Sequence, residues 1–146
     1  MKNIIITLCL FLTSGIVNAQ KSQIFAPAGK AIKGYDAVAF FKQLKPVMGA
    51  DSLSYSYKGV NWLFSSAENL TLFKANPEKY EPQFGGYCAY GIADGHKAPT
   101  QTETWAIIDD KLYFNYNLKV KEMWNKNQKN FIEKANQIWS EIKEKP

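Results

Sequence analysis

The sequence predicts an α+β fold. It is read as a single domain in which two short antiparallel hairpins form a small sheet packed against a short helix and a long C-terminal helix. Two patterns carry this prediction. Bulky residues alternate with polar ones over 53–64, and two short apolar runs over 105–108 and 112–114 flank a turn, as expected for two hairpins. Apolar residues then recur at helical spacing from about residue 117 to near the C-terminus.

The first hairpin is predicted from the alternation of Leu53, Tyr55 and Tyr57 with smaller or polar residues. The lysine and glycine at 58–59 supply the turn, and a return strand follows over 60–64. Because successive side chains on a strand point to opposite faces, the bulky residues share one side of this hairpin. That side is expected to face the core.

A short helix is predicted directly after the first hairpin. Ser65 and Glu68 have the spacing of a capping box, in which two side chains satisfy backbone amides at the start of a helix. Leu70 and Phe73 fall on its apolar side, and Pro77 either ends the helix or begins a further turn.

A second hairpin is predicted over 105–114, with its turn at 109–111, and the long helix follows it. The apolar stripe of that helix includes Trp124 and Trp139, and it must bury against another element, for which the sheet is the expected partner. The order of hairpin and then helix occurs twice in the chain. An old duplication and a common local solution that arose twice explain this order equally well.

Residues 1–19 have the features of a removable signal peptide. A lysine supplies a positive charge, an apolar run follows over 4–12, and small residues end at Ala19. The apolar run is shorter than the roughly 20 residues that a membrane-spanning helix needs, and no later segment is apolar enough to span a membrane. We therefore expect a periplasmic or secreted protein, in which a lead-in over 20–33 precedes a domain over 34–146.

Composition and motifs limit the classes of function. The formal net charge is +5, but the basic residues form no stripe, so a nucleic-acid partner is not expected. The chain has no G-x-S-x-G elbow, no phosphate-binding glycine loop and no C-x-x-C pair. A binding protein is therefore favoured over an enzyme, although the motifs alone do not decide between them.

Cys88 is the most informative residue for function. It lies in the run GGYCAYG over 85–91, and it is the only cysteine outside the leader, which contains Cys9. An unpaired thiol in an exported chain indicates a metal ligand, a redox group or an intermolecular bridge. The alternative is a small buried apolar residue. The neighbouring tyrosines indicate a partly covered thiol, so the protein is predicted to run as a monomer on non-reducing electrophoresis.

Cys88 and His96 form the candidate metal site. A thiolate and an imidazole suit copper or zinc, and Met48 and Met123 offer thioether ligands if the fold brings them close. The alternatives are an exposed loop position for His96 and core packing for the methionines. Asp36 is a further candidate, either as a ligand or base or as the cap of a turn.

Two motifs resemble the YHS domain family. The stretch YKGVNWLFSS over 57–66, followed by F-x-x-N-P-x-x-Y over 73–80, is similar to the hairpin and helix of that module. The run GYDAV over 34–38 is similar to its D-P-V opening, so the resemblance covers residues 34–82. The tail, with GGYCAYG and the second hairpin, resembles the exported branch of this family.

The resemblance implies a small binding module that handles a transition metal, with copper as the best candidate. Many YHS domains carry cysteines at the places of Ala39, Ser65 and Asn69, and all three thiols are absent here. A methyl, a hydroxyl and an amide cannot replace soft thiolate ligands, so the family's metal inference does not transfer through these positions. The alternative is a structural or protein-interaction module without metal or catalytic activity. The expected partner is accordingly a metal ion or another protein.

Overall fold

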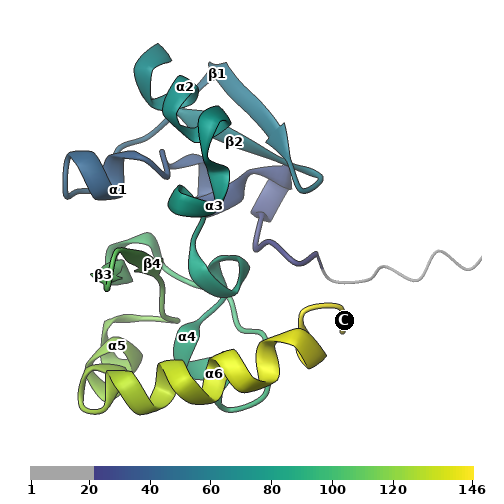
Figure 1. Ribbon diagram of the computed structural model, residues 1–146, viewed down its shortest axis with the longest axis vertical. Helices are drawn as coiled ribbons and strands as arrows, with labels where there is room; N and C mark the ends of the chain where they lie inside the picture. The colour runs from purple at the N-terminus through teal and green to yellow at the C-terminus, as the bar shows by residue number, and fades with distance from the viewer. Residues whose placement is uncertain (1–21) are drawn as a thin grey trace, which may run out of the picture.

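The computed structural model describes residues 22–146, so the predicted signal peptide at 1–19 lies outside the described residues. Helices and two small antiparallel sheets make up the described part, which confirms the predicted α+β class. Figure 1 shows an upper part that contains the first hairpin and several short helices, and a lower part that contains the C-terminal helices. The second hairpin lies between them.

The elements are mostly short, which fits the frequent glycines, prolines and turn residues of the sequence. In chain order they are η1 (Pro27–Gly29), η2 (Ala31–Gly34), α1 (Ala39–Lys42), β1 (Ala50–Tyr57), β2 (Val60–Phe64), α2 (Ala67–Ala75), α3 (Pro77–Tyr80), η3 (Gln83–Gly86), α4 (Ala89–Ala93), η4 (Thr102–Thr104), β3 (Ala106–Ile108), β4 (Lys111–Tyr113), α5 (Leu118–Asn125) and α6 (Gln128–Ile142).

The first hairpin forms as predicted. Lys58 and Gly59 have φ angles of 51° and 75°, which give a two-residue turn whose twist matches that of the flanking strands. Trp62 and Phe64 on β2 are buried against Phe73 of α2, with ring centroids 4.8 and 5.1 Å apart respectively. The hairpin and α2 therefore share one aromatic core.

The start of α2 differs from the prediction by one residue. Ser66 is the N-cap, and its hydroxyl oxygen accepts a hydrogen bond from the backbone N–H of Asn69 at 3.1 Å. Ser65 instead donates its hydroxyl to the carboxylate of Asp36 at 2.6 Å. The predicted capping box of Ser65 and Glu68 is thus wrong, because a tertiary contact takes the first serine away from the helix.

The two hairpins do not join, and this corrects the prediction of a single sheet. Strands β1–β2 and β3–β4 form separate two-stranded sheets. Strand β4 instead separates two hydrophobic clusters, because alternate residues on a strand point to opposite faces. Leu112 and Phe114 join the upper cluster, which surrounds Phe73, and Tyr113 joins the lower cluster, which surrounds Trp124.

The predicted C-terminal helix is divided into α5 and α6. Asn127 has a ψ angle of 52°, outside the helical region, and its N–H bonds to the carbonyl of Trp124. Trp124 is fully buried and Trp139 is half-buried, but α6 packs mainly on α4 rather than on a sheet. Tyr90 of α4 and Phe131 of α6 mark this contact, with ring centroids 4.8 Å apart.

None of the helices within residues 22–146 has the length and apolar character needed to cross a bilayer.

Candidate functional site

Cys88 lies in the core at the start of α4, with only 1% of its surface exposed. Its Sγ accepts hydrogen bonds from the backbone N–H groups of Gly91 at 3.4 Å and Tyr116 at 3.2 Å. The thiol donates to Oδ1 of Asn115 at 3.7 Å. Burial raises the pKa of the Cys88 thiol, and the bonds from backbone N–H groups offset this only in part. Cys88 is therefore a neutral thiol at neutral pH.

Asn115 holds the thiol in place, and no motif of the sequence marks it as a site residue. Its Oδ1 also accepts a hydrogen bond from the N–H of Tyr90, and its own N–H donates to the hydroxyl of Thr104 at 2.8 Å. Its Nδ2 is buried and has no hydrogen-bond partner within residues 22–146. The only sequence signal for this residue is a polar side chain directly after the apolar run of β4. The polar contacts of Cys88 thus belong to the packing of α4 against the end of β4.

His96 follows the end of α4, whereas Cys88 precedes its start, and His96 lies on the surface. Its side chain is 59% exposed, and its Nδ1 lies 3.7 Å from a carboxylate oxygen of Asp94. Cys88 and His96 both approach Gly91. The N–H of Gly91 contacts the sulfur, and a Cβ atom added at Gly91 would lie 3.4 Å from Nε2 of His96. The structure thus places both predicted metal ligands beside one glycine.

The remaining metal candidates add no complete site. Met48 is exposed, with its sulfur beside Gly34, and Met123 is exposed on α5. Within the part of the chain that the structure describes, no group of three or more His, Cys, Asp or Glu side chains could hold a metal ion. A structural zinc site needs four protein ligands. Cys88 and His96 therefore do not fit structural zinc and remain a two-residue candidate for copper.

The three positions at which many YHS domains carry cysteines come together around Asp36. This carboxylate is fully buried, and its Oδ1 accepts hydrogen bonds from the N–H groups of Val38 at 2.9 Å and Ala39 at 3.2 Å. Its Oδ2 accepts from the N–H and hydroxyl of Ser65 at 2.8 and 2.6 Å, and from Nδ2 of Asn69 at 2.7 Å. Of the roles considered for Asp36, the structure shows the cap of a turn.

The Asp36 network does not fit a soft metal. Five protein donors saturate the two oxygens of one carboxylate, and carboxylate oxygen is a hard ligand, unlike the thiolates that select copper or zinc. A closed hydrogen-bond network therefore occupies the place where thiols would gather. It ties the segment before α1 to the end of β2 and the start of α2.

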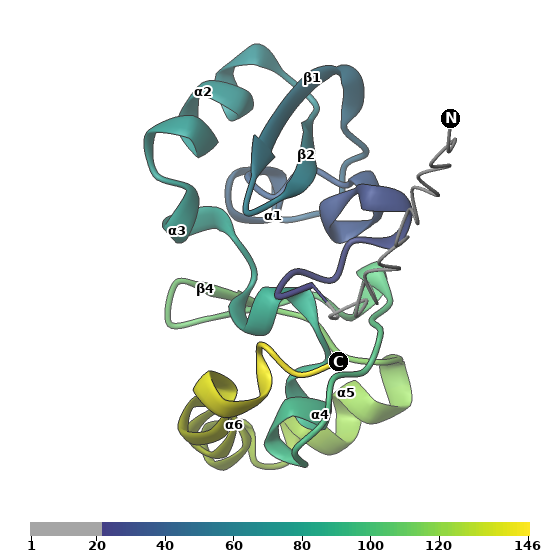
Figure 2. The ribbon, with the colours of Figure 1, turned by 90° about the vertical axis from the view of Figure 1, so that its right-hand side faces the viewer.

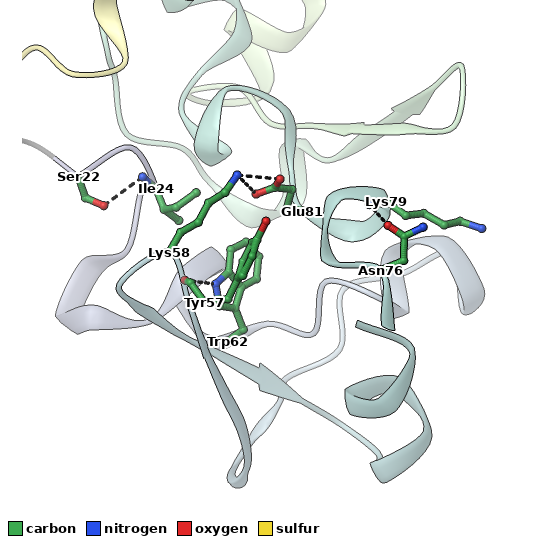
Figure 3. A network of polar contacts seen from close by, with 8 residues as sticks. All are labelled: Ser22, Ile24, Tyr57, Lys58, Trp62, Asn76, Lys79 and Glu81. Atoms are coloured by element: carbon green, nitrogen blue, oxygen red, sulfur yellow. Dashed lines mark hydrogen bonds and ion pairs between the residues drawn. The ribbon is translucent and has the colours of Figure 1, made fainter. Parts of the chain in front are cut away.

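A polar cleft of about 220 Å³ lies between the upper and lower parts of the molecule. On one wall the ammonium of Lys58 donates to both carboxylate oxygens of Glu81 at 2.9 Å (Figure 3). Burial alone lowers the pKa of Lys58, but the hydrogen bond and charge of Glu81, together with Tyr57, raise it overall. The opposite walls carry amide, aromatic and basic side chains, among them Gln23, Gln83, Phe84, Asn136, Trp139 and Lys143.

In the sequence, Lys58 is recognisable only as a turn residue. The positive φ of this position projects the lysine from the tip of the hairpin, and the turn after α3 brings Glu81 to meet it. No local pattern links residues 58 and 81, so only the tertiary structure reveals this pair. The cleft therefore had no sequence signal.

The buried position of Cys88 predicts that its thiol is unreactive in the folded protein. An aromatic disulfide reagent should modify it at least about 100-fold more slowly in buffer than in denaturant, because reaction requires local opening. A control is a Ser52→Cys variant in a Cys88→Ser background, which places a thiol on an exposed part of β1. Rapid native modification of Cys88, or a dimer band that reductant removes and Cys88→Ala lacks, would contradict the structure of this site.

No curated protein and no solved structure matches the chain. The family model of the YHS domain matches residues 44–84. That range contains the first hairpin, α2 and α3, and it includes Lys58 and Glu81 but ends before Cys88. Cys88, His96 and Met123 thus lie outside the matched range, and of the metal candidates Met48 falls inside it. Residues 44–84 of this chain match the YHS domain, as the sequence resemblance predicted.

Proposed function

We propose that this protein is a small exported binding protein, with its YHS segment as scaffold and the Lys58–Glu81 cleft as its binding site. The observation that supports this most directly is that the polar groups of the cleft are accessible, whereas those of the other candidate sites are buried. Asp36 and Cys88 are buried and engaged in internal hydrogen bonds, whereas the cleft offers accessible charged and amide groups. Small-molecule sites are typically concave and combine apolar walls with a few polar groups at a boundary between packed units.

Export is the part of this proposal that rests on residues 1–19 alone. An apolar run preceded by a positive charge and followed by small residues supports a periplasmic or secreted location. Mass spectrometry of the protein from the exported fraction should find Gln20 as the first residue. Retention of residues 1–19 in the accumulated protein would contradict export.

A screen of small metabolites by thermal unfolding tests the cleft. A ligand that binds the folded state raises Tm, and that rise should disappear in a Lys58→Gln, Glu81→Gln double variant. Both residues are changed because Glu81 is only 13% exposed, and removing Lys58 alone would leave a poorly solvated charge.

The matched control is a Lys30→Gln, Asp51→Asn variant, which removes an ion pair of similar length, 2.8 Å, at an exposed site outside the cleft. The control should keep the ligand-induced rise. An absence of any stabilising compound, or an equal rise in the cleft variant, would contradict the proposed site.

Copper handling by Cys88 and His96 is the second candidate. The observation that favours it is that both residues approach Gly91, so a soft sulfur and an imidazole lie on either side of one residue of α4. Anaerobic titration with Cu(I) against a competing chelator should show tighter binding by the wild type than by Cys88→Ser, with an intermediate value for His96→Gln. Binding no tighter than that of Cys88→Ser would remove the copper hypothesis and leave the cleft proposal intact.

A further inference from the structure

The charges that line the cleft do not balance. Lys58 and Glu81 compensate each other through their short ion pair. Lys143 also lines the cleft, from the end of α6, and within residues 22–146 its ammonium has no carboxylate partner. The cleft therefore carries one uncompensated positive charge.

Lys143 is not needed to cap its own helix. A lysine near a helix C-terminus commonly satisfies the last carbonyl groups. Here Lys97 binds the carbonyl groups directly after the helix, because its Nζ donates to the carbonyl oxygens of Lys143 at 2.6 Å and Lys145 at 2.7 Å. The side chain of Lys143 is thus left to contribute its charge to the cleft.

The rest of the cleft is suited to a small polar molecule. The rings of Phe84 and Trp139 pack edge to face at 5.9 Å and supply an apolar wall, while Gln83 and Asn136 supply neutral donors and acceptors. Glu81 retains acceptor capacity beyond its bonds to Lys58, since a carboxylate offers about four lone-pair sites. The volume of about 220 Å³ is below the range of roughly 300–1,000 Å³ typical of drug-sized ligands.

We propose that the cleft binds an acidic amino acid, a small organic monoanion, with its side-chain carboxylate on Lys143 and its α-ammonium group on Glu81. The inference rests on the proposed binding function and specifies the ligand class for that site. Negative charge on the ligand compensates Lys143, and the donor group uses the free lone pairs of Glu81. The apolar part of the ligand lies against Trp139.

L-glutamate and L-glutamine are matched probes, since they have nearly the same shape and differ by one negative charge. Titration of isotope-labelled protein, followed through the indole N–H resonance of Trp139, should show glutamate binding about 3- to 10-fold more tightly than glutamine, as expected for one partly exposed ion pair. The preference should vanish in Lys143→Gln. It should persist in Lys145→Gln, which removes a charge at the same helix end outside the cleft.

The outcomes separate this inference from the function on which it rests. Equal binding of glutamate and glutamine to the wild type would overturn the monoanion class and leave a binding cleft. An unchanged glutamate preference in Lys143→Gln would overturn the assignment of Lys143. No response of the Trp139 resonance to either amino acid would also overturn the ligand class, and the metabolite screen would then decide the binding function by itself.

Discussion

Replacing Asp36 with alanine should lower the free energy of unfolding by about 3–5 kcal/mol. The buried carboxylate accepts five hydrogen bonds, and its loss leaves the hydroxyl of Ser65 and the amide of Asn69 without their acceptor. Unpaired buried donors retain the full cost of their desolvation, which is larger than the net gain of an ordinary hydrogen bond. The effect should appear as a lower urea midpoint in tryptophan fluorescence.

Two further variants test whether the destabilisation comes from the loss of the buried carboxylate. Asp51→Ala removes a carboxylate that is 80% exposed and paired only with Lys30, so its effect should stay within about 0.5 kcal/mol. Asp36→Asn keeps the shape of the side chain but turns an NH₂ group toward the donors, so it should also destabilise strongly. A stability of Asp36→Ala within about 1 kcal/mol of the wild type would show that the network is not a structural centre.

Replacing Phe73 with alanine should destabilise the protein by a similar amount, about 3–5 kcal/mol. Phe73 is fully buried, and its ring contacts those of Tyr55, Tyr57, Trp62 and Phe64 at centroid distances of 6.3, 5.8, 4.8 and 5.1 Å. Truncation leaves a cavity between the first hairpin and α2, since neither element can move in without losing its other contacts.

Phe73→Leu is the matched variant for this prediction. It keeps an apolar side chain in the same place and should cost less than half as much as Phe73→Ala, because most of the cavity stays filled. Urea unfolding of both variants gives the comparison. Equal destabilisation by leucine and alanine would mean that the aromatic ring contacts, rather than the filled volume, dominate at this position.

Local patterns predicted the local elements. Alternation placed the first hairpin and its turn at Lys58 and Gly59, because strand pairing across a two-residue loop needs only neighbouring residues. Helical spacing likewise predicted apolar burial for Trp124. The division of the last helix at Asn127 and the shift of the N-cap to Ser66 escaped prediction, since each depends on contacts that a periodic pattern does not encode.

The arrangement of the sheets and sites could not be predicted because it depends on distant residues. The two faces of β4 serve two different cores, which a single alternating pattern cannot reveal. Asp36 reaches Ser65 and Asn69 across 29 and 33 positions, and Lys58 reaches Glu81 across 23. For Cys88 and His96, the alternatives of a buried thiol and an exposed loop histidine, both set against a metal site, are what the structure shows.

The lead-in ties the start of the described chain to its end. The N–H of Phe25 donates to the carbonyl of Gly85 at 2.8 Å, the hydroxyl of Tyr87 donates to the carbonyl of Ser22 at 2.7 Å, and Gln23 bonds to Glu144. Figure 2 shows this segment passing between the upper and lower parts, close to the C-terminus.

These contacts have a consequence for synthesis of the chain. Gln23 and Glu144 are separated by 121 positions, and closing so long a loop carries a high entropic cost, so such contacts form late in folding. A ribosome-bound chain that still lacks the end of α6 can form the bonds of the lead-in to Gly85 and Tyr87, but not the bond from Gln23 to Glu144. Truncation before Glu144 removes one of these three contacts, so the lead-in should become easier for proteases to reach.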